Sequence, residues 1–309
     1  MVTIIIPCYN YGWLLPQTLD SMLAQTYKDW ECIIIDDGST DNSRSIGEAY
    51  AQRDSRFRYH YQTNCGMSAA RNKGLTIANG LYVQFLDADD LLTPRKLEIQ
   101  VSFLESRPEV DLVYSDVRYF LHEQPARLSQ SMDMKDQRWM SFAEGQGECL
   151  INAVVEKNLM VVNAPLTRAG LLHKAGFFAE DLRSAEDWEY WVRCALFGGH
   201  FCYDRNPESL ALVRVHPTST SQNVKRFHDY VLIVRERIGL ELHRRGLWKA
   251  TQINELAKIE SFATLGAHYL EKGNILDGVK IFLVLARTTG NYRYYLGSIG
   301  YWLKIRINS

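Results

Sequence analysis

The sequence predicts an α/β protein, with a mostly parallel sheet covered by helices on both faces and a helical C-terminal extension. Short β-branched runs alternate with segments of helical periodicity through the first 115 residues. Such alternation is typical of parallel strands joined by crossover helices. After residue 222 the apolar spacing is helical throughout. With 309 residues, 46% of them hydrophobic, the chain can form one large or two ordinary domains.

The first strand is predicted at Val2–Ile6, a β-branched run that Pro7 ends. Tyr9-Asn10-Tyr11-Gly12 has the composition of a loop. Pro16 marks the start of a helix that ends near Gln25.

The second strand, Glu31–Ile35, ends in Asp36-Asp37. Asp41 is placed to cap the helix that follows, through Tyr50. A third strand is predicted at Phe57–Tyr61.

The next helix spans about Ser68 to Asn79, before Gly80. Tyr82–Leu86 is the fourth strand, Pro94 opens another helix, and Val110–Tyr114 is the fifth strand.

In the second half, Gln124–Gly147 is polar and weakly periodic, which predicts a long loop. Ser184 is placed to cap a helix, and Ser209–Val215 resembles a strand. Three helices are expected in the extension, at about Phe227–Arg245, Thr251–Lys272 and Ile275–Arg287.

Asp87 and Asp89 follow the fourth strand directly and share one face of an extended segment. Two carboxylates on one face repel each other, and a divalent cation such as Mg²⁺ or Mn²⁺ would relieve that repulsion. The alternative is a solvated turn, since Asp is common in turns.

Polar or aromatic groups follow three of the predicted strands: Tyr9, Asp36-Asp37 and Asp87–Asp89. Ligands bind at the carboxyl ends of strands in such sheets, so these groups predict one shared crevice. The sequence lacks G-x-G-x-x-G after the first strand, the P-loop pattern and G-x-S-x-G. These absences argue against a dinucleotide fold, a P-loop enzyme and a serine hydrolase.

Five blocks resemble, in order and spacing, the family 2 glycosyltransferases of GT-A (Rossmann-like) fold. They are Ile4-Ile5-Ile6-Pro7-Cys8-Tyr9-Asn10, Ile34-Ile35-Asp36-Asp37-Gly38-Ser39-Thr40-Asp41, Asn64-Cys65-Gly66-Met67-Ser68-Ala69-Ala70-Arg71-Asn72, Phe85-Leu86-Asp87-Ala88-Asp89-Asp90 and Ser184-Ala185-Glu186-Asp187-Trp188-Glu189-Tyr190-Trp191-Val192-Arg193. The resemblance covers residues 1 to about 220.

The resemblance implies inverting transfer of a sugar from a nucleotide donor, usually UDP-linked, with Mg²⁺ or Mn²⁺. Tyr9 would stack on the base and Asp37 or Asp36 would accept a hydrogen bond from it. Arg71 would meet the base or the diphosphate; the alternative is a structural pair with Asp36 or Asp37. Asp87 would lie near the ribose, and Asp89 would hold the metal. The remaining donor-site residues of the matched blocks are Pro7, Asn64, Gly66 and Ala88.

Glu186 and Asp187 lie in the first turn of a predicted helix, where a solvated helix start is the alternative to a catalytic role. Adjacent helical residues point about 100° apart, so only one of them can face the crevice. The resemblance favours Asp187 as the general base. His216 is expected either near the diphosphate and metal or in a polar loop.

The resemblance leads to a division into a nucleotide-sugar-binding half (1–115), an acceptor and catalytic half (116–222) and the helical extension (223–309). The Gln124–Gly147 loop is then a candidate acceptor lid. A nucleotidyltransferase or a non-catalytic nucleotide-sugar-binding or scaffold protein would be the competing functions. The acceptor is expected to be a sugar or a lipid-linked hydroxyl, no nucleic-acid partner is expected, and the oligomeric state is left open.

Charge differs between the two parts. Residues 1–222 carry 21 Lys and Arg against 29 Asp and Glu, a net charge of −8, and residues 223–309 carry 14 against 7, a net charge of +7. The basic extension ends in an aromatic, basic stretch, Tyr292–Ile307, that fits an interfacial helix or a dimer contact. The six scattered cysteines predict reduced thiols and a cytoplasmic location. The basic extension adds the expectation of peripheral contact at the inner face of the membrane.

Overall fold

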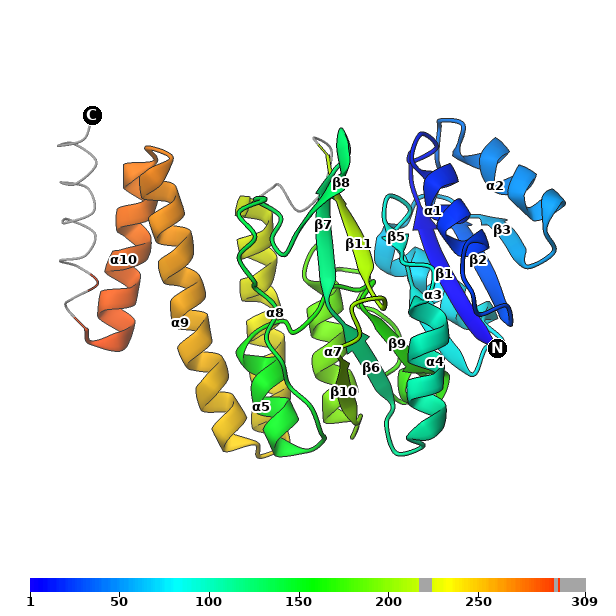
Figure 1. Ribbon diagram of the computed structural model, residues 1–309. Helices are drawn as coiled ribbons and strands as arrows, with labels where there is room; N and C mark the ends of the chain where they lie inside the picture. Colours follow the sequence, from blue (N-terminus) through cyan, green and yellow to red (C-terminus); the bar gives the residue numbers. More distant parts are fainter. Residues whose placement is uncertain (217–223, 292–293, 295–309) are drawn as a thin grey trace. The chain divides into compact units, whose positions relative to one another are not determined.

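The computed structural model describes residues 1–216, 224–291 and 294. It divides into two compact units, Met1–Gln222 and Asn223–Ser309. The first unit is built on a seven-stranded sheet of order β10-β6-β9-β4-β1-β2-β3 (Figure 1). The strands are β1 (Val2–Cys8), β2 (Trp30–Asp36), β3 (Phe57–Tyr61), β4 (Tyr82–Phe85), β6 (Leu112–Ser115), β9 (Pro165–Arg168) and β10 (Phe201–Asp204).

The main sheet is mostly parallel, as predicted. Only β9 runs antiparallel to its neighbours, β4 and β6. β1 and β2 are buried along their whole length, which is why both read as continuous apolar runs.

Helices pack around this sheet, and the predicted α/β class is confirmed. α3 packs against β1 and β2, α2 against β2 and β3, and α4 against β6 and β9. The helices are α1 (Leu15–Leu23), α2 (Ser43–Arg53), α3 (Met67–Ile77), α4 (Lys96–Ser106), α5 (Glu148–Glu156), α6 (Ala169–Ala175) and α7 (Glu186–Leu196).

The helix starts differ in part from the predictions. Asp41 accepts the backbone N–H of Ser43 at 2.9 Å, although Asn42 is the residue that precedes α2. The predicted cap at Ser184 is wrong, because Ala185 precedes α7 in a left-handed conformation and no side chain caps this helix. Ser184 therefore lies one residue too early to reach the first free N–H groups.

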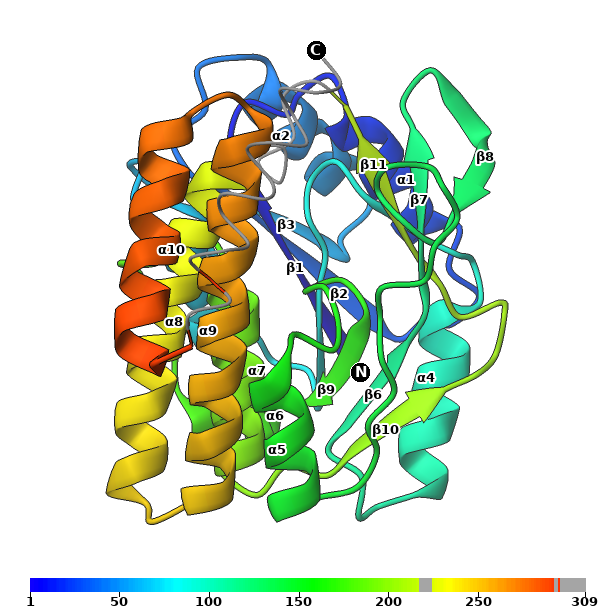
Figure 2. The same cartoon turned by 90° about the vertical axis from the view of Figure 1, so that its left-hand side faces the viewer.

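The prediction of one long loop at Gln124–Gly147 is wrong at its start. Gln124–Ser129 forms β8, which pairs with β7 (Val117–Leu121) in a second sheet of order β5-β11-β7-β8. The other members are β5 (Leu91–Leu92) and β11 (Ala211–Val215), and Figure 2 shows the β7–β8 hairpin beside β11. All but the last residue of β8 are exposed, so this edge strand lacks the apolar alternation by which strands are recognised.

The rest of that segment is tied to the main sheet. The backbones of Gly145 and Phe201 exchange two hydrogen bonds, at 2.8 and 2.9 Å. The Tyr114 hydroxyl accepts the Ala143 N–H at 2.9 Å and donates to the Ala143 carbonyl at 3.0 Å. Residues 143–145 are therefore anchored over β6 and β10.

The second unit contains α8 (Val224–Arg244), α9 (Trp248–Glu271) and α10 (Ile275–Thr289), and α9 packs against the other two. No helix in the described part of the chain is both long and apolar enough to cross a membrane. The predicted interfacial helix at Tyr292–Ile307 lies, apart from Tyr294, outside the described residues.

Candidate active site

The carboxyl ends of β1, β2, β4, β6 and β10 lie at one edge of the main sheet, and the antiparallel β9 begins there. The polar and aromatic residues at or just beyond this edge are Tyr9, Asp36, Asp37, Asp87, Asp89, Asp116, Asn163 and Asp204. The edge therefore brings together all three groups that the sequence placed in one crevice.

Asp36 and Asp37 shape the side of the edge nearest β3. Asp36 has no exposed surface and accepts hydrogen bonds from the Tyr59 hydroxyl at 2.6 Å and the Ser39 N–H at 2.7 Å. Asp37 accepts the backbone N–H groups of Cys65 and Gly66, at 2.9 and 2.8 Å. Both carboxylates thus anchor loops, and Asp37 sets the backbone course of 64–66.

The other donor-site candidates of this region differ in exposure. Tyr9 is 48% exposed and Asn64 is exposed as well. Gly66 has a φ of +97°, and a Cβ there would meet a guanidinium nitrogen of Arg183 at 1.8 Å. Pro7 and Ala88 are buried.

Arg71 links the acidic turn after β4 to the start of α7. Its side chain is 1% exposed and forms ion pairs with Asp87 at 2.8 Å and Glu186 at 2.7 Å. Its ion-pair partners are thus Asp87 and Glu186, and the pair with Asp36 or Asp37 that the sequence offered as an alternative is not formed. Burial raises the pKa of Asp87, and Arg71 opposes that rise.

The acidic turn itself is held from two sides. The Asp87 N–H donates to Asn163 Oδ1 at 2.9 Å, and Asn163 Nδ2 donates to Asp90. Asp90 also accepts the Arg214 N–H at 2.7 Å, and the Arg214 guanidinium donates to the Asp89 carbonyl at 2.8 Å. Asn163 and Arg214 together fix the backbone from 87 to 90.

Asp89 and His216 meet beside this turn, with Asp89 Oδ2 and His216 Nε2 2.9 Å apart. The rings of Tyr11 and Trp13 flank the imidazole at 5.8 and 5.6 Å. Within the described residues no group of three or more His, Cys, Asp or Glu is arranged to hold a metal ion. One carboxylate and one imidazole nevertheless suit Mg²⁺ or Mn²⁺ when substrate oxygens and water supply the remaining ligands.

Glu186 and Asp187 have separate partners. Glu186 is buried against Arg71, whereas Asp187 is only partly buried. Asp187 accepts the Trp188 N–H at 2.7 Å and lies 3.4 Å from Asn158 Nδ2. Burial, and after it the Glu186 carboxylate, raise the pKa of Asp187 to about 7. A carboxylate with such a pKa can accept a proton near neutral pH.

Four residues of this site were not among the candidates that the sequence indicated: Tyr11, Trp13, Asn163 and Arg214. Arg214 could have been found, because it alternates with His216 along a strand and so shares its face. Asn163 gave no such signal, since its role depends on an antiparallel strand that the sequence pattern did not indicate.

Comparisons with known proteins show which family the chain resembles. The sequence model of the family described as Glycosyl transferase family 2 matches residues 3–156. The chain is 30% identical to the uncharacterized glycosyltransferase EpsJ of Bacillus subtilis, over 74% of this chain and 67% of that protein. Two glycosyltransferases of Rickettsia felis and Rickettsia conorii, 34% and 33% identical over 63% of this chain, are matched over only 30% of their own length.

Solved structures share the fold. The S. aureus TarS 1–349 complex with UDP-GlcNAc has a TM-score of 0.60 at 19% identity, covering 76% of this chain and 65% of that one. A mannosyltransferase of Pyrobaculum calidifontis, in complex with GDP-Man and Mn²⁺, has a TM-score of 0.56 at 18% identity, covering 99% and 86%. On the combined sequence and fold similarity, this chain belongs to glycosyl transferase family 2.

Proposed function

We propose that the protein is a metal-dependent, inverting glycosyltransferase that moves a sugar from a UDP-linked donor to a hydroxyl acceptor. The observation that carries this proposal is the ion-pair chain Asp87–Arg71–Glu186. It joins the acidic turn, where the donor would bind, to the helix that carries Asp187. Donor site and base would then be held together by a single buried guanidinium.

On the donor side, Tyr9, directly after β1, offers an exposed ring on which a base can stack. Asp89 and His216 would hold Mg²⁺ or Mn²⁺, which would offset the charge that develops on the leaving diphosphate. The structural neighbours support a nucleotide-sugar donor, since TarS was solved with UDP-GlcNAc and the Pyrobaculum enzyme with GDP-Man and Mn²⁺.

In the reaction, the acceptor oxygen forms a bond to the anomeric carbon while the bond from that carbon to the diphosphate oxygen breaks. The acceptor hydroxyl loses its proton to Asp187. Glu186 cannot serve equally well, because its carboxylate is already paired with Arg71. Residues 1–115 would supply most of the donor half, and 116–222 would supply the acceptor and catalytic half together with His216.

Release of the nucleoside diphosphate tests the proposal. UDP-GlcNAc, other UDP-sugars and GDP-Man are each incubated with the protein and Mn²⁺, with and without sugar acceptors. UDP release that requires Mn²⁺ and rises with an acceptor is expected. Absence of release from every donor would show that the protein is not an active transferase of this class.

A further inference from the structure

We propose that Lys96 is a positioning residue for the acidic turn: its buried ammonium keeps residues 87–90 in place for the donor diphosphate and the metal. This inference rests on the proposed function and deepens it. It assigns a role in donor binding to a residue that acts through others.

Lys96 is the first residue of α4, and it has no exposed surface. An ammonium carries three N–H groups. Lys96 Nζ donates to Gln84 Oε1 at 3.0 Å, to Gln100 Oε1 at 2.5 Å and to the Ala164 carbonyl at 2.9 Å. All three acceptors are neutral and belong to fully buried residues. Lys96 thus joins α4 to β4 and to the residue that precedes β9.

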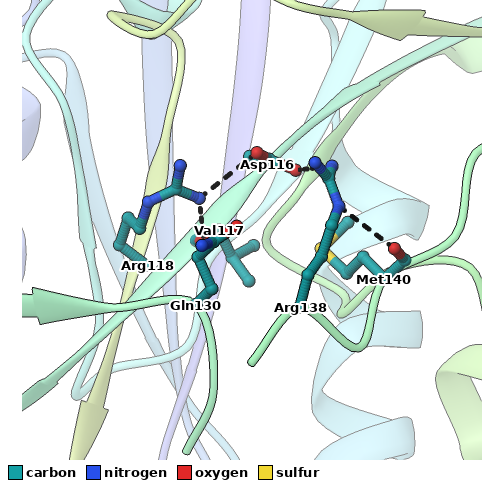
Figure 3. Close-up of a pocket in the computed structure, with 6 residues that line it drawn as sticks. All are labelled: Asp116, Val117, Arg118, Gln130, Arg138 and Met140. Atoms are coloured by element: carbon teal, nitrogen blue, oxygen red, sulfur yellow. Dashed lines mark hydrogen bonds and ion pairs between the residues drawn. The ribbon is translucent and has the colours of Figure 1, made fainter. Parts of the chain in front are cut away.

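The surroundings of Lys96 differ from those of Asp116, which lies at the same edge of the sheet. Arg118 and Arg138 approach the Asp116 carboxylate from opposite sides and offset its charge, as Figure 3 shows. The Lys96 ammonium instead donates to amide and carbonyl oxygens. Burial lowers the pKa of Lys96 to about 7, and Asp204 opposes that fall. A charge buried among neutral groups costs stability, and arrangements that cost stability are typical of functional sites.

Two links lead from Lys96 to Asn163. One is the Gln84 side chain, which accepts from Lys96 through Oε1 and donates through Nε2 to the Asn163 carbonyl at 2.9 Å. The other is the carbonyl of Ala164, the next residue along the chain. The side-chain amide of Asn163 in turn hydrogen-bonds both ends of the acidic turn. The position of the turn therefore depends on Lys96 through a single asparagine.

The acidic turn needs such support because Asp87, Asp89 and Asp90 gather like charge within four residues. Their repulsion opposes a fixed turn, whereas a metal and a diphosphate require one. Residues that orient metal ligands without touching the metal typically contribute about 10- to 100-fold to metal affinity or activity.

Calorimetry of UDP binding with Mn²⁺ tests the inference in a double-mutant cycle. Lys96→Met removes the three donors and should weaken UDP binding about tenfold, the lower end of that range. In the Asn163→Ala background the same change should cost less than about threefold, because the link to the turn is already cut. A lysine with a merely structural role would affect UDP binding equally in both backgrounds.

Thr3→Val is the matched control for lost stability. Thr3 is fully buried near the start of β1, at the end of that strand away from the active edge. Its hydroxyl donates to Glu31 at 2.7 Å and accepts the Gly80 N–H at 2.8 Å. Thr3→Val should lower the urea midpoint and leave UDP affinity unchanged.

Hydrogen exchange separates this inference from the proposed function, because it needs no nucleotide. The Asp87 N–H, which donates to Asn163, should exchange about tenfold faster in Lys96→Met, the scale of one lost hydrogen bond. Gln84→Met cuts the same link and should have the same effect, so it decides the matter if Lys96→Met does not fold.

Failure of the wild-type protein to bind UDP would count against the proposed function, and exchange of the Asp87 N–H would then decide the inference alone. The inference is refuted when folded Lys96→Met or Gln84→Met keeps wild-type exchange at Asp87. It is equally refuted when Asn163→Ala does not reduce the effect of Lys96→Met on UDP affinity.

Discussion

At the scale of single residues, Glu186 and Asp187 show how one helical step separates two roles. Glu186 is paired with Arg71, whereas Asp187 accepts hydrogen bonds from two neutral groups, the Trp188 N–H and the Asn158 amide. Asp187 can therefore take up a proton without breaking an ion pair. From the sequence, the effects of the helix start and of the neighbouring carboxylate could not be ranked. In the structure, burial and the Glu186 carboxylate raise the pKa of Asp187 by more than Arg71 and the Trp188 N–H lower it.

The first prediction follows from that assignment. Asp187→Asn should lower kcat about 10²- to 10⁴-fold, the usual contribution of a general base, and leave UDP affinity within a few-fold. Steady-state kinetics and calorimetry measure the two effects. Near-normal turnover of Asp187→Asn beside an inactive Glu186→Gln would reverse the assignment.

The pH dependence is the second prediction. Because the pKa of Asp187 is raised to about 7, the base is protonated and inactive below that pH, and kcat/KM should rise as the pH passes through about 7. Glu186→Gln removes a negative neighbour that raises this pKa, so the rise should move to lower pH. A pH–rate profile that is the same in both proteins would assign the titration to another group.

The third prediction concerns Asp89. Asp89→Ala removes the carboxylate that meets His216 and should abolish the Mn²⁺ dependence of UDP binding while the fold persists. Calorimetry with Mn²⁺ and with EDTA measures it, and circular dichroism controls for folding. Equal UDP affinity of the wild-type protein under both conditions would exclude a metal role.

At the scale of elements, the start of β9 supports the acidic turn after β4. Asn163 is 1% exposed, and its side-chain amide accepts the Asp87 N–H and donates to the Asp90 carboxylate. Its backbone carbonyl accepts a hydrogen bond from Gln84 Nε2 at 2.9 Å. The fixed position of the turn therefore depends on a residue 76 positions further along the chain, just before β9.

The fourth prediction tests this support. Asn163→Ala leaves a backbone N–H and a carboxylate oxygen without their partners, which should cost about 1–3 kcal/mol of unfolding free energy. UDP binding should weaken as the turn loosens. Urea denaturation and calorimetry measure both effects, with Gln52→Ala, at an exposed amide on α2, as the control. Stability and UDP affinity equal to the control would show that Asn163 does not position the turn.

The same elements explain how far the sequence could be read. β1, β2 and β4 are buried on both faces, so their apolar runs indicated strands and their polar ends indicated the crevice. β8 lies exposed and gave no apolar signal. The Arg71–Glu186 pair joins residues 115 positions apart, and the local spacing of residues does not predict such a contact.

At the scale of the whole molecule, charge is divided between the two compact units. The unit that contains the candidate active site carries a net charge of −8 through residue 222, and the residues beyond carry +7. Leu240, Trp248 and Leu276 on the helices of the second unit are 74%, 61% and 77% exposed. Basic residues with exposed apolar side chains are typical of a surface that contacts anionic lipid.

The last prediction is that the second unit binds anionic membranes and so brings the active site to a lipid-linked acceptor. Each basic residue near such a surface contributes about 1 kcal/mol, and salt screens the attraction. The full chain should float with phosphatidylglycerol vesicles at low salt, not with phosphatidylcholine, and should dissociate in about 0.5 M NaCl, where the Debye length falls to a few ångströms.

Lys249→Glu with Lys272→Glu should weaken flotation, because the two exposed residues then repel the surface. Lys157→Glu with Lys174→Glu changes the charge of the first unit equally and should have little effect. If the wild-type protein does not float with anionic vesicles at low salt, the prediction is wrong, and the basic unit forms packing or oligomer contacts instead.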